Sequence, residues 1–192
     1  MCGPSLGGEK CQATALYAMN SASDVLLKCD RFFVERVVQT GSDGKLHHRQ
    51  VVRHPGSVVI LPCVDDEHVC LIRNYRVAVG KTLIELPAGT LEPGEDPQAT
   101  AFRELIEETG YRAKHMQRLH AFYAAPGILD EQMALFAATG LTAGEPEREA
   151  GEQIENLLMS WEEALDMVRL GDICDAKTIV GLLYWQLHRG NR

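Results

Sequence analysis

The pattern of hydrophobic positions predicts a β-rich first half of the chain. Segments 31–38 and 45–52 flank a Gly-Ser-Asp-Gly turn, so they are expected to pair as a hairpin. Short continuous apolar runs follow, and they predict buried strands at 57–64, 68–75 and 82–86. Pro87 ends the last of these strands, and a glycine-containing loop is expected to run from there to Glu95.

The hydrophobic period changes at Asp96, which is followed by Pro97 and predicts the N-cap of a helix. The helix is expected to run to Thr109 and to end at Gly110, because glycine suits the left-handed position after a helix. A Ser-x-x-Glu capping box predicts the start of another helix. The remaining expected elements are strands at 119–125, 132–139 and 155–160 and helices at 161–170 and 175–188. This order predicts an α+β fold, a mixed sheet with helices packed on it.

Composition narrows the class of protein. The chain has 192 residues, of which 45% are hydrophobic and 24% are charged, which is typical of a globular protein with one core. The formal net charge of −8 argues against nucleic-acid binding through phosphate contacts. No apolar run is long enough to span a bilayer, so no membrane association is expected.

Six cysteines are present, and no two of them form a C-x-x-C pair. In a long, core-rich chain they are expected to be reduced and mostly buried thiols. The first residues carry no basic start followed by an apolar stretch, which a secretory signal needs. We therefore expect a cytoplasmic protein. The cysteines are Cys2, Cys11, Cys29, Cys63, Cys70 and Cys174.

Three glutamates of the helix at 97–109 carry the candidate chemistry. At about 100° per residue, Glu104, Glu107 and Glu108 are expected on the face opposite Phe102 and Leu105. A solvated acidic face is the ordinary interpretation of such a cluster. The alternative is a metal site, because crowded carboxylates repel one another and hard cations such as Mg²⁺ take oxygen ligands.

The spacing of these residues favours the metal site. The segment that begins at Gly89 reads G-x5-E-x7-R-E-L-x-E-E-x-G and closely resembles the Nudix box. It departs from the box at Tyr111, a packing position that is usually aliphatic. The resemblance implies a Nudix fold, which is an α/β/α sandwich with a mixed β-sheet, here preceded by an N-terminal antiparallel β-sheet region. It also implies metal-dependent hydrolysis of a phosphoanhydride bond in a nucleoside diphosphate linked to another group.

The resemblance assigns roles inside the box. The cofactor implied is Mg²⁺ (or Mn²⁺), with Glu104 and Glu108 as main ligands and Glu107 as a helper. The carbonyl of Ala88 or Gly89 is a further expected ligand. Arg103 is expected to orient the carboxylates and, with Glu107, to count among the catalytic residues. The expected structural residues of the box are Glu95, Gly89 and Gly110.

Two neighbouring segments resemble ADP-ribose pyrophosphatases. The first leads into the box, with Asn74 in place of the usual glutamine. There the resemblance makes Arg76 a phosphate-binding residue. It makes Glu85 a residue that contacts either the substrate or a side chain that binds the substrate. The second segment lies downstream of the box, where Pro126 and Glu131 are expected to contact substrate. Taken alone, Pro126 is equally well interpreted as an ordinary turn residue.

An acidic loop after the strand at 132–139 is expected to supply a further glutamate. In similar proteins this position holds a metal-binding or catalytic carboxylate, and Glu152 fits it best as the general base. Its neighbours Glu145, Glu147 and Glu149 are weaker candidates, because a loop of this kind can also be solvent-exposed charge. If none of them acts, Glu131 is the remaining candidate.

The expected organisation has three parts: a flexible N-terminal tail (1–20), an N-terminal β region (21–56) and a Nudix hydrolase domain (57–192). A hairpin cannot bury its apolar face alone, and similar proteins exchange this sheet between subunits. The N-terminal β region is therefore expected to form a homodimer. The expected partner is a small nucleoside diphosphate sugar.

Other substrates and one other class of protein stay open. The same fold would serve another nucleotide sugar, such as GDP-mannose or ADP-glucose. Cleavage of oxidised nucleoside triphosphates is disfavoured by the N-terminal extension and the Pro126 segment. A non-catalytic ligand sensor is disfavoured because the box glutamates are intact and no basic DNA-binding region is present.

Overall fold

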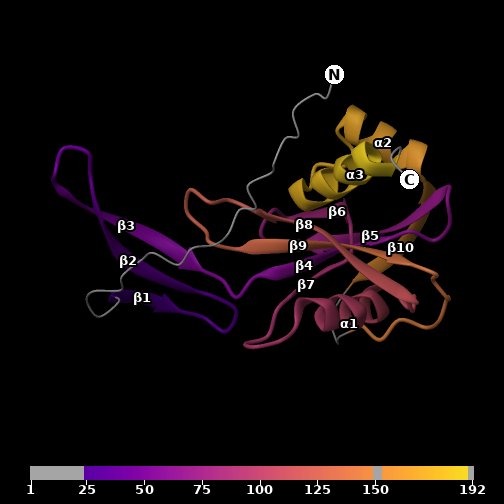
Figure 1. The fold of residues 1–192 in the computed structure, drawn as a ribbon, viewed down its shortest axis with the longest axis horizontal. Helices are drawn as coiled ribbons and strands as arrows, with labels where there is room; N and C mark the ends of the chain where they lie inside the picture. The colour runs from indigo at the N-terminus through magenta and orange to yellow at the C-terminus, as the bar shows by residue number, and fades with distance from the viewer. Residues whose placement is uncertain (1–23, 149–152, 190–192) are drawn as a thin grey trace, which may run out of the picture.

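The computed structural model describes residues 24–148 and 153–189 and arranges them in layers (Figure 1). β-Sheets form the middle layer, with one helix on one side of it and two helices on the other. A separate three-stranded sheet extends away from this sandwich at the N-terminal end. The α+β class, the helix–sheet–helix layering and the additional antiparallel sheet were all predicted from the sequence, and all three are confirmed.

The N-terminal sheet has the order β1-β2-β3 and is antiparallel throughout. Its strands are β1 (Asp24–Lys28), β2 (Phe33–Thr40) and β3 (Leu46–Arg53). The predicted turn joins β2 to β3, with Gly44 at a positive φ of 73°. β1 is a strand that the sequence pattern did not predict. Large apolar side chains of this sheet are exposed, including those of Leu27, Val38 and Leu46.

The middle layer contains two sheets. The first has the order β7-β4-β9-β8, and its central pair, β4 and β9, is parallel while the outer pairs are antiparallel. The second has the order β10-β5-β6 and is antiparallel. The strands are β4 (Ser57–Pro62), β5 (His68–Arg76), β6 (Lys81–Glu85), β7 (Ala88–Thr90), β8 (His115–Tyr123), β9 (Gln132–Thr139) and β10 (Ile154–Ser160).

Two predictions about these strands are wrong. The loop expected after Pro87 begins with the short strand β7, which pairs with β4 through Val59 and Ala88. β8 begins at His115 and not at residue 119, because pairing with β9 extends over a segment that lacks apolar alternation. In both places the backbone partner decides the structure, and the local sequence does not reveal that partner.

The helix boundaries follow the predicted caps. α1 (Pro97–Thr109) begins after the N-cap Asp96, whose carboxylate accepts the Ala99 N–H at 3.0 Å. It ends at Gly110, which has a left-handed φ of 77°. α2 (Trp161–Leu170) begins with the predicted capping box, and α3 (Ala176–Arg189) is the last helix described.

The core has two parts that meet at β4, whose residues are buried on both faces. Val59 and Leu61 pack into a cluster that includes Leu182 of α3. Val58 and Ile60 pack into a second cluster that includes Leu105 of α1. Helices on both faces explain why this strand is a continuous apolar run. No helix among residues 24–148 and 153–189 is long and apolar enough to cross a membrane.

Candidate active site

The site is built where β7 leads toward α1, and Gly89 of β7 lies directly against Glu104 of α1. A Cβ atom added at Gly89 would collide with the carboxyl group of Glu104. Only glycine lets the helix approach the strand this closely. The structure thus gives a physical reason for glycine at this position of the box. The pairing of β7 with β4 fixes the backbone of Ala88, whose carbonyl is a predicted metal ligand.

The three box glutamates do not all lie on an exposed face. Glu108 is only 5% exposed, and its carboxylate accepts the Ala88 N–H at 2.9 Å. The prediction that placed Glu108 opposite the buried face is wrong, because Glu108 lies one turn from Leu105 and on the same side as Ala101. Its carboxylate is oriented toward β7, where a backbone N–H compensates its burial.

Arg103 holds the other carboxylates of the helix. Its Nη1 atom lies 2.8 Å from both Glu104 and Glu107, while Nε and Nη2 each lie 3.3 Å from Glu95. Burial opposes the charge of Arg103, but the hydrogen bond to Glu95 and the nearby Glu104 and Glu107 raise its pKa above the ordinary value. The Glu92 N–H and then Arg103 lower the pKa of Glu95. One cation therefore offsets the repulsion among three glutamates.

The donors present fit a hard divalent cation. Carboxylate and carbonyl oxygens are the ligands that Mg²⁺ and Mn²⁺ prefer, and Glu104, Glu107, Glu108 and Ala88 line one cavity. Within the described parts of the chain, no three His, Cys, Asp or Glu side chains already form a cluster that could hold an ion. The carboxylates of Glu104 and Glu107 instead contact Arg103.

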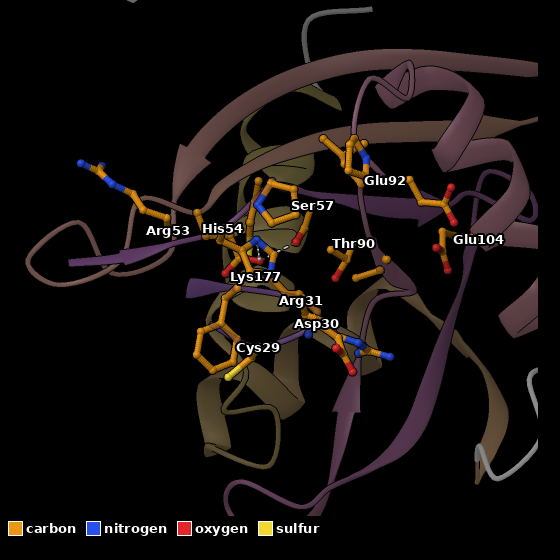
Figure 2. Close-up of a pocket in the computed structure, with 18 of the residues that line it drawn as sticks. Cys29, Asp30, Arg31, Arg53, His54, Ser57, Thr90, Glu92, Glu104 and Lys177 are labelled. Atoms are coloured by element: carbon orange, nitrogen blue, oxygen red, sulfur yellow. Dashed lines mark hydrogen bonds and ion pairs between the residues drawn. The ribbon is translucent and has the colours of Figure 1, made fainter. Parts of the chain in front are cut away.

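These residues line a cavity of about 840 Å³. Figure 2 shows Glu92 and Glu104 on one side of this cavity and Arg53, His54 and Lys177 on the other. The turn between β1 and β2 contributes to the lining through Cys29, Asp30 and Arg31. The cationic side chains of the lining are Lys28, Arg31, Arg53, Arg76, Arg103 and Lys177, and the acidic ones are Asp30, Glu92, Glu104, Glu107, Glu108 and Glu131. A cavity lined by both carboxylates and cations suits a polyanion that binds together with metal.

Arg76 and Glu85, both predicted substrate residues, are bound to each other. The guanidinium of Arg76 donates to both oxygens of Glu85, from Nε at 2.8 Å and from Nη2 at 2.6 Å. Burial would raise the pKa of Glu85, yet the hydrogen bond from Arg76 and the charge of Lys177 lower it below the ordinary value. Arg76 lines the cavity, while Glu85 is 1% exposed and lies behind it.

Lys177 is a residue of the cavity that sequence reasoning did not find. It lines the cavity from the start of α3 and forms ion pairs with Glu85 and Asp175. The segment around it resembles the ending of ADP-ribose pyrophosphatases, but nothing local marks this lysine as part of a site. Glu85 and Lys177 are 92 residues apart in the sequence, so only folding brings them together.

The Pro126 segment contributes Glu131 to the cavity but not Pro126. Glu131 lines the cavity, accepts a short hydrogen bond from the Ser57 hydroxyl and lies 3.6 Å from His54 Nδ1. Pro126 lines a separate hollow of about 210 Å³ beside Tyr123. Glu131 is therefore held in place by two neighbours.

The N-terminal sheet is tied to the same segment. Arg53 at the end of β3 contacts Glu35 of β2 at 2.6 Å and Asp130 at 3.0 Å. The backbone adds a hydrogen bond from Val52 N–H to the carbonyl of Ile128 at 2.8 Å. These bonds connect the N-terminal sheet to one wall of the cavity.

The glutamate favoured as general base, Glu152, lies outside the described residues, as does Glu149. Elsewhere in the acidic loop, Glu147 contacts Arg112 at 2.8 Å on the surface. Arg148 donates to the carbonyl of Glu108, at the C-terminal end of α1. The described part of the acidic loop thus contacts the end of the helix that carries the box glutamates.

Known proteins resemble this chain along most of its length. The NUDIX domain family model matches residues 53–179. An ADP-ribose pyrophosphatase of Bacillus subtilis is 40% identical over 76% of this chain and 80% of its own length. A GDP-mannose pyrophosphatase of Cronobacter sakazakii is 37% identical over 82% of this chain and 90% of its own length. A solved structure described as an ADP compounds hydrolase has a TM-score of 0.76 at 23% identity, and it covers 88% of this chain and 93% of its own, which supports the fold.

The contact between Gly89 and Glu104 predicts that Gly89→Ala weakens metal binding. The added methyl group would displace the Glu104 carboxylate. We expect the affinity for Mn²⁺ to fall by roughly 10- to 100-fold, which is the loss seen when the residues that orient metal ligands are disturbed. Mn²⁺ binding measured by electron paramagnetic resonance tests this. Gly127→Ala is the control, since a Cβ there meets no atom within 4 Å and the backbone is not in the left-handed region. Equal Mn²⁺ affinity in both variants would contradict the prediction.

Proposed function

The chain belongs to the NUDIX domain family of hydrolases, and from that premise we propose that it hydrolyses ADP-ribose to AMP and ribose 5-phosphate. One observation carries the proposal: the glutamates of α1 and the cations Arg76 and Lys177 line the same cavity. A diphosphate would lie between them, with metal ions held by the glutamates neutralising its charge on one side and the two cations contacting it on the other. The similarity to the Bacillus subtilis ADP-ribose pyrophosphatase supports the choice of substrate.

Besides the general base, the proposed site contains three kinds of group: metal ligands, positioning residues and a phosphate-binding cation. Glu104, Glu107, Glu108 and the carbonyl of Ala88 hold Mg²⁺ or Mn²⁺, which when bound neutralises the diphosphate and lowers the pKa of a coordinated water. Arg103 keeps the carboxylates of Glu104 and Glu107 in orientation, while Glu95 keeps Arg103 in place. Arg76, which lines the same cavity, binds a phosphate oxygen. These groups position the substrate for attack by water on one phosphorus.

We assign the general base to Glu152. Water adds across the P–O–P bridge, so its oxygen joins one phosphate, the bridging oxygen leaves with the other, and a proton must be accepted. The box carboxylates are committed to metal, and Glu131 already binds Ser57, which makes it a poorer acceptor. The acidic loop that carries Glu152 is fastened to α1 through Arg148, and this contact supports the assignment.

Hydrolysis of GDP-mannose is a second candidate. It is supported by the GDP-mannose pyrophosphatase of Cronobacter sakazakii, which matches a slightly larger part of this chain at a similar identity. Both substrates have the same diphosphate, so the groups described above serve either one. The difference lies in recognition of the base and of the sugar.

We also propose that the protein is a cytoplasmic homodimer with three parts: a tail (1–20), a dimerising β region (21–56) and a catalytic domain (57–192). The exposed apolar side chains of the N-terminal sheet, including Leu27 and Val38, support this interface. The cysteines of the described part of the chain differ in exposure: Cys63 and Cys70 are buried, Cys29 is half-buried and Cys174 is exposed. Burial raises the pKa of Cys70 to about 11, which makes it an unreactive thiol.

A panel of nucleotide sugars tests the substrate. With Mg²⁺, ADP-ribose should release AMP with a higher kcat/KM than GDP-mannose, ADP-glucose or an oxidised nucleoside triphosphate, and chromatography of the products measures this. EDTA should abolish turnover and added Mg²⁺ should restore it, because the phosphates need charge neutralisation. Preferred cleavage of GDP-mannose would select the second candidate, and full activity after metal removal would contradict both.

Replacing Glu152 tests the base. Glu152→Gln keeps the shape of the side chain and removes the proton acceptor, so kcat should fall by roughly 10²- to 10⁴-fold with little change in KM. Glu149→Gln is the matched control from the same loop and should retain most of the activity. The reverse result would move the assignment to Glu149, and normal rates in both variants would direct attention to Glu131.

Light scattering over a dilution series tests the assembly. The mass should correspond to two chains, because the exposed apolar face of the N-terminal sheet needs a partner surface. Leu27→Asp together with Val38→Asp should shift the mass toward one chain, since charges placed in an apolar interface oppose association. Leu170→Asp is the control, because Leu170 is also an exposed apolar residue but lies on α2. A fully active single chain would contradict the proposal.

A further inference from the structure

The last turn of α1 carries two of the proposed metal ligands, Glu107 and Glu108. The last carbonyl groups of a helix have no partner within it, and helix ends fray unless other groups hold them. Within α1 itself (residues 97–109), no basic side chain lies in the last turn. The Gly110 N–H binds the Ile106 carbonyl at 2.8 Å. The carbonyl groups that follow Ile106 are therefore left for donors from outside the helix.

Arg148 and Asn156 supply such donors. Nε and Nη2 of Arg148 lie 3.3 and 3.2 Å from the carbonyl oxygen of Glu108. Asn156 Nδ2 donates to the carbonyl of Thr109 at 2.7 Å. The two side chains are also bonded to each other, because Arg148 Nη2 donates to Asn156 Oδ1 at 2.9 Å. We call these two side chains the clamp, since together they hold successive carbonyl groups of the helix end.

The acidic loop that carries Arg148 is packed against the same helix end. A Cβ atom added at Gly110 would collide with the carbonyl oxygen of Gly144, so the two backbones touch. The Glu147 N–H also lies toward the Ile106 carbonyl, at 3.4 Å. In Figure 1 the orange segment between β9 and β10 runs beside α1. The backbone of this loop therefore keeps Arg148 close to the last turn of the helix.

The need to hold a strand residue against the helix explains the asparagine at position 156. Asn156 is an exposed residue of β10 and is paired with Ile72 of β5. Asparagine is depleted in strands, where β-branched side chains are favoured. Its amide has one group that donates and one that accepts, and the clamp uses both, toward Thr109 and toward Arg148. A β-branched residue would suit the strand but could not join the loop to the helix end.

We propose that the clamp positions the metal site: it holds the last turn of α1 so that Glu107 and Glu108 keep the geometry that a divalent cation requires. The inference rests on the proposed function, because it takes these glutamates as metal ligands. The side chain of Glu108 is held by the Ala88 N–H, and the clamp holds its backbone. Groups that orient the ligands of a metal site contribute roughly 10- to 100-fold to its affinity.

The positive charge of Arg148 acts in the opposite direction to this positioning. Like charges repel, so a guanidinium group beside the carbonyl of Glu108 opposes the binding of a divalent cation to the Glu108 carboxylate. On charge alone, a neutral side chain at position 148 would tighten metal binding, whereas loss of the clamp weakens it. The sign of the change in metal affinity therefore distinguishes the two effects.

Titration with Mn²⁺ in the absence of substrate, followed by electron paramagnetic resonance, tests the proposal. Arg148→Met and Asn156→Val should each bind Mn²⁺ roughly tenfold more weakly than the wild type. The double variant should lose little more than either single variant, because side chains bonded to each other act as one unit. Arg148→Lys should recover part of the affinity, since an ammonium group can still donate to the Glu108 carbonyl. Arg73→Met is the matched control, because Arg73 pairs with Glu155 across the same two strands, and it should bind Mn²⁺ like the wild type.

The outcomes separate this inference from the proposed substrate. Unchanged or tighter Mn²⁺ binding in folded clamp variants overturns the inference, even where ADP-ribose is hydrolysed. A fall in kcat at saturating Mn²⁺ without a change in affinity overturns it as well. Weaker Mn²⁺ binding by the clamp variants of a protein that does not cleave ADP-ribose supports the inference and rejects the substrate. If thermal unfolding shows that Arg148→Met does not fold, Arg148→Gln replaces it and should show the same loss.

Discussion

The repulsion among the glutamates of the box is the constraint on which the site depends. Four carboxylates gather around one end of β7 and the middle of α1, and each is held by a donor. Arg103 contacts Glu95, Glu104 and Glu107, and the Ala88 N–H takes Glu108. This arrangement requires the helix to lie close against β7, which is possible because position 89 is glycine. The packing of α1 on β4 then keeps the carboxylates at the edge of the cavity.

The cationic part of the cavity lining is assembled from distant parts of the chain. Arg76 comes from β5, Glu85 from β6 and Lys177 from α3, and Glu85 binds both cations. Thr178 fastens α3 to the backbone of Leu86, two residues before Ala88. The attachment of α3 therefore positions both the cations and the start of the box loop.

The N-terminal sheet is joined to the site through the segment before β9. Arg53 bridges Glu35 and Asp130, and the backbone of Val52 pairs with that segment. Glu131, next to Asp130, reaches the cavity and contacts Ser57 at the start of β4. A change in how this sheet is held, for example by a second subunit, would therefore act on the cavity wall. Membership of the family identifies the reaction. The contacts described above show how the N-terminal sheet of this chain is connected to the cavity.

The sequence by itself determined the features set by short-range physics: the caps at Asp96 and Gly110, the capping box of α2, the apolar runs of the inner strands and the spacing of the box. Tertiary structure decided what depends on distant partners. β1, β7 and the start of β8 are strands because another strand pairs with them. Glu108 is buried because β7 supplies an N–H, which helix periodicity alone does not show. Lys177 could not be predicted as a cavity residue, because its ion pair with Glu85 depends on their distance in space and not on their separation along the chain.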